Sequence, residues 1–410
     1  MKSNITRREF LTKTAIATVG VSAIPLMSKT LQSNDIVNIG IIGTGDRGAE
    51  LVKIASQVHE IRVIACCDVL PEHLQDGLQY AAKGAKGYSD YKEMLKNREL
   101  DAVIVCTPLY LHYQMSIDAL DAGKHVYCEK TMTHTIEQAI QLVQKVKDSK
   151  KTFQVGYQLP YNPLYQEIKE MITAGACGQI TQIACTYNRN GDWRREVIDP
   201  KNERLINWRM YWEYSGGLMA ELCSHQIGIV NWILNAHPLK VCGFGGIDYW
   251  KDGREIFDNV TVVYDYPNGV KASFNSITTN AQSGVSIKMM GTEGTIEITK
   301  EEGQEAIFYT EDSVLKQTKK NQSDSTDAIS SATLKAWKQG KGVEIKVDNQ
   351  PSGDFITTGL AFKHFTECIL KNSTPIVNVE SGRQAAISVH MANIAMKNEN
   401  TEYWKDEYSV

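Results

Sequence analysis

The chain has 410 residues, of which 42% are hydrophobic and 22% are charged, and its net charge is −4 at pH 7. This length and composition predict a folded protein of two or three domains and exclude a disordered chain, a collagen and a multi-span membrane protein. The lack of a basic excess argues against a nucleic-acid-binding protein that depends on its overall field.

The N-terminal segment predicts an export signal. Arg7 and Arg8 stand just before Phe10 and Leu11, and a modestly apolar stretch, 15–27, follows. Paired arginines before such a stretch resemble a twin-arginine signal, and the stretch is shorter than the roughly 20 residues that span a bilayer. We therefore expect residues 1–33 to be a signal, the mature chain to have no stable membrane span, and the protein to be periplasmic. The alternative is a basic N-terminus or the first helix of a folded domain.

Residues 34–155 predict a dinucleotide-binding domain built on a doubly wound parallel sheet. Continuous β-branched runs are typical of strands that are buried on both faces of such a sheet. The expected strands are 36–42, 61–67, 102–106, 125–128 and 152–155, with helices at 111–122 and 136–147. This alternation of strand and helix is the pattern of a Rossmann domain.

Residues 156–410 predict a second domain of the α+β type, for substrate binding and oligomerisation. The expected helices are 164–173, 218–234, 355–370 and 382–396, and the expected strands are 180–187, 241–249, 260–266, 270–277, 285–290 and 295–298. Consecutive strands joined by short turns, such as Pro267-Asn268-Gly269, predict an open and mainly antiparallel sheet. We expect the last helices to return and pack on the first domain, and the polar stretch 311–350 predicts a surface excursion.

A glycine-rich turn follows the first expected strand and opens a helix. It reads Gly43-Thr44-Gly45-Asp46-Arg47-Gly48, and its three glycines allow a tight turn, a close approach to a pyrophosphate and close helix–strand packing. Asp68 ends the second strand, where a carboxylate accepts both ribose hydroxyls of NAD and repels a 2′-phosphate. We therefore expect NAD rather than NADP, although the Arg47 guanidinium could hold a 2′-phosphate. The alternative is a glycine-rich turn that binds nothing.

Three titratable residues are candidates for chemistry. Lys130 follows the strand 125–128 and so lies at the carboxyl edge of the sheet, where such folds bind ligands. Glu221 and His225 are four residues apart on an expected helix and therefore share one face. The alternatives are a solvated lysine and a structural hydrogen-bonded pair.

The long stretch 187–214 predicts the substrate site. It is rich in tryptophan, arginine and asparagine, which suit the faces, hydroxyls and carboxylates of sugars. Its candidate residues, together with one that follows the last strand of the first domain, are Tyr157, Arg189, Trp193, Arg209 and Tyr211. The alternative is an ordinary long loop.

The nine cysteines have no repeated Cys-x-x-Cys spacing. Their number and spacing fit neither a disulfide framework nor a structural zinc site, and we expect no metal. Most fall in apolar strand runs, so they predict small buried core residues. Unpaired thiols are compatible with twin-arginine export, because that route carries chains already folded in the cytoplasm.

The order of these motifs resembles the Gfo/Idh/MocA family, named for glucose–fructose oxidoreductase and inositol dehydrogenase. The resemblance extends from about Ile36 to the final helices and depends on several motifs together. These are Gly43–Gly48, Cys106-Thr107-Pro108 with His112, Ala122-Gly123-Lys124-His125-Val126, Glu129-Lys130, and Gly216-Gly217 leading to Glu221 and His225.

The resemblance implies an NAD-dependent oxidoreductase that acts on a secondary alcohol of a sugar, glycoside or cyclitol. His225 would take the hydroxyl proton, Lys130 would stabilise the oxyanion or share the base role, and Glu221 would orient His225. The cofactor would be held by the glycine turn and Asp68, and also by Thr107, Pro108, His112, Glu129, Lys130 and Gln158. A homo-oligomer, a dimer or a tetramer, would form through the C-terminal sheet, and an exported enzyme would suit a tightly bound NAD.

Three departures from the family pattern concern the site. Thr131 stands where the family usually has proline, Glu221 where it usually has aspartate, and Gly228 where it often has aspartate. Two other functions stay open. One is an NAD-dependent glycosidase that uses transient oxidation at C3 and elimination, and the other is a non-catalytic sugar- or nucleotide-binding protein.

Overall fold

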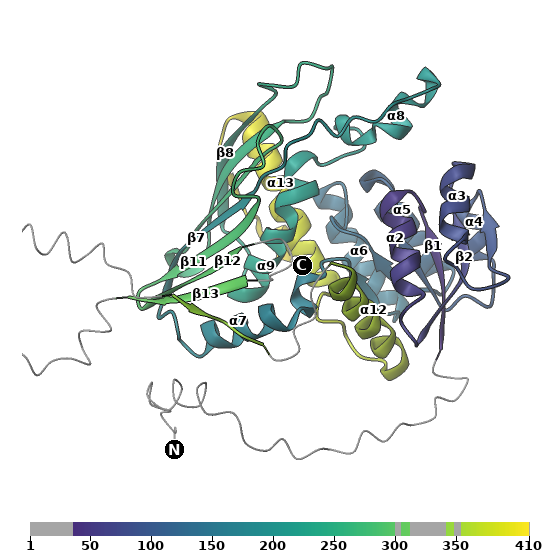
Figure 1. Cartoon of the computed structure of the whole chain (residues 1–410), viewed down its shortest axis with the longest axis horizontal. Coiled ribbons are helices and arrows are strands. Elements are labelled where there is room, and N and C mark those ends of the chain that lie inside the picture. The colour runs from purple at the N-terminus through teal and green to yellow at the C-terminus, as the bar shows by residue number, and fades with distance from the viewer. Residues whose placement is uncertain (1–35, 300–304, 312–341, 348–353, 410) are drawn as a thin grey trace, which may run out of the picture. The chain divides into compact units, whose positions relative to one another are not determined.

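The computed structural model describes residues 36–299, 305–311, 342–347 and 354–409 (Figure 1). The expected export signal lies outside the described residues, as does most of the expected surface excursion.

The N-terminal domain is built on a six-stranded parallel sheet with the order β3-β2-β1-β4-β5-β6. Its strands are β1 (Val37–Ile42), β2 (Ile61–Cys67), β3 (Lys86–Tyr88), β4 (Ala102–Val105), β5 (His125–Cys128) and β6 (Phe153–Val155). This is the Rossmann order. The order of the strands along the chain reverses between β1 and β4, and this switch point is where such folds bind ligands. The sequence did not predict β3, because Lys86-Gly87-Tyr88 is a short, partly exposed edge strand without an apolar run.

Helices cover both faces of this sheet (Figure 1). They are α2 (Asp46–Ala55), α3 (Pro71–Leu78), α4 (Tyr91–Leu95), α5 (His112–Asp121) and α6 (Ile136–Ser149), with a 3₁₀ turn η2 (Leu109–Leu111) before α5. Alternate strand residues face opposite sides: Ile39 and Ile41 pack with α2, whereas Val103 and Val105 pack with α5 and α6. Burial on both sides explains why the strands are continuously apolar in sequence.

The C-terminal domain is built on a nine-stranded sheet with the order β14-β13-β12-β11-β7-β10-β9-β8-β15. Its strands are β7 (Ile180–Tyr187), β8 (Lys240–Gly246), β9 (Asn259–Asp265), β10 (Lys271–Ile277), β11 (Val285–Gly291), β12 (Gly294–Thr299), β13 (Glu305–Thr310), β14 (Val343–Glu344) and β15 (Glu402–Tyr403). Among the described strands of this sheet, the β7–β10 pair alone is parallel, so the prediction of an α/β Rossmann domain followed by a mainly antiparallel α+β domain is confirmed.

The C-terminal part of the chain has four long helices, and the last two of them connect the two domains. They are α7 (Pro163–Thr173), α9 (Ser224–Leu234), α12 (Asp354–Lys371) and α13 (Val379–Asn398). Phe362 and Phe365 of α12 pack edge-on against Tyr127 of β5, with ring centroids 4.9 and 5.8 Å apart. Helix α13 contacts α6 of the first domain as well as α9 and β8 of the second. The chain thus returns to the Rossmann domain after the C-terminal sheet is complete.

The cysteines are unpaired, as expected, and seven of the nine are buried. Burial raises the pKa of the Cys66, Cys67, Cys128 and Cys223 thiols to about 12, so these side chains are unreactive core residues. No helix in the described part of the chain is long and apolar enough to cross a membrane.

Candidate active site

The glycine turn after β1 is shaped by two close backbone approaches. Gly43 has a φ of 87°, and a Cβ there would lie 2.4 Å from the carbonyl oxygen of Cys106, at the end of β4. A Cβ on Gly48 would lie 1.9 Å from the carbonyl oxygen of Gly43. Only glycine fits either position, and α2 therefore begins directly against the sheet with its N–H groups at the switch point. Gly45, which caps this helix, provides no side-chain hydrogen bond, so the helix terminus can receive an anion such as a pyrophosphate.

Asp68 braces this turn from the neighbouring strand. One of its carboxylate oxygens accepts a hydrogen bond of 2.8 Å from the Thr44 backbone N–H, and the other accepts one of 2.9 Å from Leu70. Each carboxylate oxygen can accept more than one hydrogen bond, so the group still fits ribose hydroxyls. The Thr44 side chain is fully buried and faces Gly77 of α3, so only the backbone of Thr44 is available to a cofactor.

His73, which no motif in the sequence indicates, also lies beside Asp68. Its Nδ1 atom is 3.7 Å from a carboxylate oxygen of Asp68, and its ring faces Gly45. The local sequence indicates a role for His73 only by its position, which is in the first turn of α3 and five residues after Asp68.

Arg47 extends toward the end of β5. Its guanidinium contacts Glu129 at 3.4 Å, Glu50 at 2.8 Å and the Thr358 hydroxyl of α12 at 3.4 Å. These contacts favour a role in joining α2, β5 and α12 over the binding of a 2′-phosphate near Asp68.

Lys130 reaches from the end of β5 to the C-terminal domain. Its ammonium group donates a hydrogen bond of 3.0 Å to the backbone carbonyl of Glu221, and the hydroxyl of Thr131 donates one of 3.2 Å to the carbonyl of Ala220. The Lys130–Thr131 peptide is cis. Glu129 is buried, and one of its carboxylate oxygens accepts a hydrogen bond from the backbone N–H of Lys130.

His112 supports this arrangement from α5. The ring is buried, and its two nitrogens lie 2.9 Å from the carbonyl oxygen of Thr131 and 2.8 Å from that of Thr107. Both nitrogens are therefore engaged with the backbone, and we assign His112 to positioning Lys130 and the Thr107-Pro108 turn rather than to cofactor contact. Thr107 and Pro108 are partly exposed where β4 ends.

The expected helix 218–234 begins with a π-helical turn, η6 (Met219–Cys223), before α9. The wider turn presents the carbonyls of Ala220 and Glu221 to Thr131 and Lys130. π-Turns are rare and often occur at functional sites. They also change which side chains meet, so the expected i,i+4 geometry does not apply here.

Glu221 pairs with Arg209 and not with His225, so the expectation that Glu221 orients His225 is wrong for this structure. The Glu221 carboxylate accepts a hydrogen bond of 3.0 Å from Nε of Arg209, and no hydrogen bond joins Glu221 to His225 in the described chain. Burial alone would raise the pKa of Glu221, but the charges of Arg209 and Lys130 hold it below its ordinary value. Arg209 also lies over the ring of Trp208, 4.3 Å from its centroid.

His225 projects from the first turn of α9 between two tyrosines. The ring centroids of Tyr157 and Tyr187 lie 6.3 and 6.2 Å from that of the imidazole, and neither ring nitrogen has a hydrogen-bond partner among the described residues. Burial, with the positive charges of Lys130 and two arginines nearby, holds the pKa of His225 well below its ordinary value. A neutral imidazole with unengaged nitrogens can accept a proton from a ligand.

Tyr157 supports His225 rather than facing the solvent. The residue is 3% exposed and its hydroxyl is buried without a hydrogen-bond partner among the described residues, so its contact with a substrate stays a prediction. A Cβ on Gly228 would lie 3.4 Å from the Tyr157 ring, so the small residue at this position accommodates the tyrosine. Gln158 is also buried, at the start of the 3₁₀ turn η3 (Leu159–Tyr161).

The other substrate candidates occupy the long connection after β7. Arg189 is exposed and lies over Tyr187, to whose hydroxyl it donates a hydrogen bond of 3.1 Å. Trp193 has a φ of 62° and packs against the core, and the hydroxyl of Tyr211 donates to Glu203 at 3.0 Å. Arg209 is thus the predicted substrate residue that the structure brings into direct contact with a predicted catalytic residue, Glu221.

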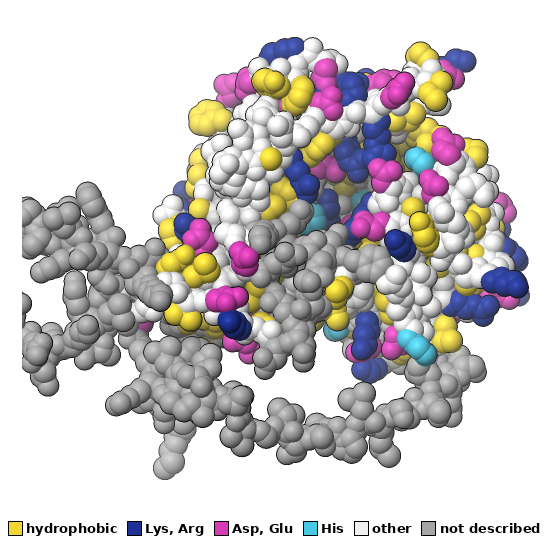
Figure 2. Space-filling model, viewed as in Figure 1, with side chains coloured by type: hydrophobic (Ala, Val, Ile, Leu, Met, Phe, Trp, Pro, Cys, Tyr) yellow, Lys and Arg dark blue, Asp and Glu magenta, His cyan; other side chains and the backbone are white. Residues whose placement is uncertain are grey.

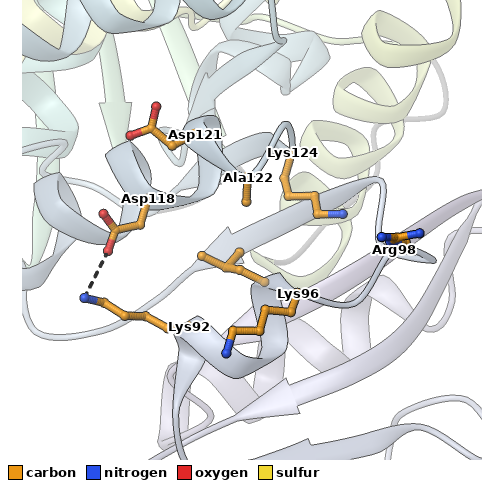
Figure 3. A pocket seen from close by; sticks show the side chains of 8 residues that line it. Lys92, Lys96, Arg98, Asp118, Asp121, Ala122 and Lys124 are labelled. Atoms are coloured by element: carbon orange, nitrogen blue, oxygen red, sulfur yellow. Dashed lines mark ion pairs between the residues drawn. The ribbon is translucent and has the colours of Figure 1, made fainter.

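Lys, Arg and His side chains gather in the hollow between the two domains (Figure 2). A separate surface hollow of about 540 Å³ lies between α4 and α5 (Figure 3). It is at the opposite, amino edge of the Rossmann sheet, since Lys124 in its wall directly precedes β5. Lys124 donates to the carbonyls of Asn97 and Leu100, and Lys92 pairs with Asp118 at 3.9 Å.

Among the described residues, no cluster of three or more His, Cys, Asp or Glu side chains could hold a metal ion.

Known proteins match this chain in both domains. Residues 37–157 match the family model described as an oxidoreductase family with an NAD-binding Rossmann fold, and residues 165–297 match the Gfo/Idh/MocA C-terminal domain. A glycosyl hydrolase family 109 protein of Shewanella pealeana is 26% identical over 263 residues, covering 57% of this chain and 56% of that protein. An inositol 2-dehydrogenase of Salmonella typhimurium is 27% identical over 199 residues, covering 48% and 54%. The matches thus span little more than half the length of these relatives.

Solved structures share the fold over a greater length. Levoglucosan dehydrogenase in complex with NADH and levoglucosan has a TM-score of 0.72 at 19% identity, covering 90% of this chain and 99% of that chain. An oxidoreductase domain protein from Kribbella flavida has a TM-score of 0.75 at 15% identity, covering 90% and 100%.

The close glycine approaches, the uncapped start of α2 and the Asp68 carboxylate fit the NAD that the first family model implies. The chain belongs to the Gfo/Idh/MocA family of oxidoreductases, with an NAD-binding Rossmann domain followed by the C-terminal domain of that family.

Proposed function

We propose that this protein oxidises or reduces a secondary alcohol of a sugar, glycoside or cyclitol with NAD. The observation that carries the proposal is the convergence of Lys130 and His225 where the carboxyl edge of the Rossmann sheet meets the C-terminal domain. The pKa of His225 is lowered and its ring has no hydrogen-bond partner among the described residues, which suits a base that takes the hydroxyl proton. When bound, NAD supplies the nicotinamide that accepts a hydride from the carbinol carbon.

Lys130 has the complementary role. Its ammonium group is held by one backbone carbonyl, which leaves two of its three N–H donors for a substrate oxygen. A positive charge at that place stabilises the negative charge that develops on the oxygen as its proton leaves. The Arg209–Glu221 pair stands next to this site and provides a guanidinium that can bind a sugar hydroxyl or carboxylate.

The substrate class is supported by the names of similar proteins. An inositol 2-dehydrogenase is among the relatives, and levoglucosan dehydrogenase, solved with levoglucosan or L-sorbose, is among the similar structures. These names favour a polyhydroxylated ring, and the aromatic and basic residues of the connection after β7 are suited to bind one.

A glycosidase is the second candidate, because a glycosyl hydrolase family 109 protein is among the relatives. Incubation with NAD and nitrophenyl glycosides separates the two functions. We expect NADH or a keto sugar to form without release of nitrophenol, whereas release of nitrophenol without net NADH would instead indicate the glycosidase. If Lys130→Ala and His225→Ala leave every activity of the preparation unchanged, the protein is a non-catalytic binder.

We also infer that the protein is exported to the periplasm by the twin-arginine route. The inference depends on Arg7 and Arg8 and on the modestly apolar stretch that follows them. Replacing both arginines with lysine should leave the full-length protein in the cytoplasmic fraction, whereas the unchanged chain should appear in the periplasmic fraction. Export of both forms would contradict the inference.

A further inference from the structure

The connection between β7 and η6 crosses from the C-terminal domain to the Rossmann domain. It contains the short helical turns η4 (Pro200–Asn202), α8 (Glu203–Ile206) and η5 (Trp208–Met210). In Figure 1, α8 lies above α2 and α5. We call residues 191–215 the crossing segment.

The crossing segment contacts the Rossmann domain near both sides of the switch point. At one end, the guanidinium of Arg195 forms an ion pair with the carboxylate of Asp46, which lies in the glycine turn and is the first residue of α2. At the other end, the rings of Tyr214 and Tyr110 pack with centroids 4.9 Å apart, and Tyr110 lies in η2, which follows β4. The segment is thus tied to the loops that follow both β1 and β4.

The fold itself holds the backbone of Arg195 in place. The side chain of Asn207 accepts a hydrogen bond of 2.7 Å from the backbone N–H of Arg195 and donates one of 3.1 Å to its carbonyl. Asn207 is 1% exposed, and its amide also donates to the carboxylate of Glu203 at 3.1 Å. A buried amide that satisfies both backbone groups of one residue fixes that residue, so the position of Arg195 is built into the fold.

The charges at the N-terminus of α2 are suited to retain a bound dinucleotide. The N-terminus of α2 favours an anion, and the glycine turn places the pyrophosphate of NAD there. The Asp46 carboxylate at the same terminus would repel that pyrophosphate unless a cation neutralised it. Arg195 is that cation, and it comes from the other domain.

We propose that Arg195 is a cofactor-retaining residue, which neutralises Asp46 at the start of α2 and slows the release of NAD. The proposal depends on the NAD-binding Rossmann domain and not on the reaction proposed above. It also assigns a function to the crossing segment, which ties the C-terminal domain to the cofactor.

The rate of NADH release from the full chain tests this proposal without any substrate. Protein loaded with NADH is mixed with excess NAD, and the loss of NADH fluorescence is followed by stopped flow. The side chains of Arg195 and Asp46 are 43% and 73% exposed, so Arg195→Ala should release NADH roughly two- to fivefold faster, the effect of losing one exposed ion pair. Arg195→Lys should keep most of the retention, and Asp46→Asn added to Arg195→Ala should restore part of it by removing the uncompensated carboxylate.

Arg204→Ala is the matched control. Arg204 lies in the same segment and pairs with Glu213 and Glu255, both in the C-terminal domain, so its loss should leave NADH release unchanged. Equal rates of NADH release from Arg195→Ala and the wild type would overturn the proposal. Equal acceleration of NADH release by Arg195→Ala and Arg204→Ala would also overturn it, because retention would then depend on the folding of the segment. Absence of sugar oxidation would overturn the proposed function alone, because NADH release is measured without a sugar.

Discussion

The ammonium group of Lys130 and the backbone carbonyl of Glu221 lie 3.0 Å apart, and this contact joins the end of a Rossmann strand to the π-helical turn of the other domain. The carbonyl is presented to Lys130 where the helix widens. The same turn leads into α9, which carries His225. One local feature of the helix therefore fixes the positions of both proposed catalytic groups.

The pH dependence of the reaction should report the environment of His225. The proton-accepting form is neutral, so activity is lost as the pH falls through the pKa of the ring. Because burial and nearby positive charges lower that pKa, kcat/KM should stay constant to a pH well below the ordinary histidine value of about 6.5. A pH–rate profile with an acid limb centred near 7 would contradict a lowered pKa.

Replacing His225 tests its role directly. His225→Asn should lower kcat by roughly 10²- to 10⁴-fold, the usual contribution of a general base. The affinity for NADH, measured by fluorescence titration, should stay at the wild-type value. A variant that loses NADH binding and activity together would assign the histidine to binding instead.

The Arg209–Glu221 pair should contribute to stability at neutral pH. Glu221 is 14% exposed, so Arg209→Ala leaves a mostly buried carboxylate without its partner and should lower the free energy of unfolding by roughly 1–2 kcal/mol. The folded-state pKa of Glu221 is depressed, so the pair stabilises the protein fully above the unfolded pKa of about 4.3 and loses this effect as the pH falls through the folded value. Denaturant titrations at pH 7 and pH 4 should show the difference between wild type and variant shrinking, and a difference that grows at pH 4 would contradict the pairing.

The parts of the site that could be predicted from sequence are those that follow strands along the chain. The glycine turn, Asp68 and Lys130 each come directly after a strand, and parallel strands end at one edge of the sheet. The pairing of Glu221 could not be predicted, because the π-turn depends on tertiary partners, Lys130 and Thr131, about ninety residues earlier.

Contacts between the two domains could not be predicted from the sequence either. The ion pair between Arg195 and Asp46 joins residues 149 positions apart, and nothing local to either residue indicates the other. The sequence did not predict edge strands such as β3 for another reason. A strand that is not buried on both faces needs no apolar run.

The close approach of Gly48 to the sheet predicts that a single methyl group disrupts the cofactor turn. Gly48→Ala places a Cβ 1.9 Å from the Gly43 carbonyl oxygen, so the backbone must move. We expect a loss of roughly 1–3 kcal/mol of stability and at least about tenfold weaker NADH binding. Gly359→Ala is the matched control, because its Cβ would meet only Ile54 at 3.8 Å inside helix α12, and its stability should be unchanged or slightly higher. Equal behaviour of the two variants in thermal melts and NADH titrations would refute the packing argument.

The outer face of the C-terminal sheet should form the interface of a homo-oligomer. Phe244 of β8 is 82% exposed, and Cys242 on the same face pairs in register with Val263, which is 40% exposed. Large exposed apolar side chains grouped on one sheet face are typical of an interaction surface. Phe244→Asp should therefore lower the molecular mass measured by light scattering after gel filtration. Ile198→Asp, at a residue that is 96% exposed but lies outside the sheet, should leave the mass of the oligomer unchanged. A wild-type protein that is monomeric, or an oligomer that survives Phe244→Asp intact, would exclude this face as the interface.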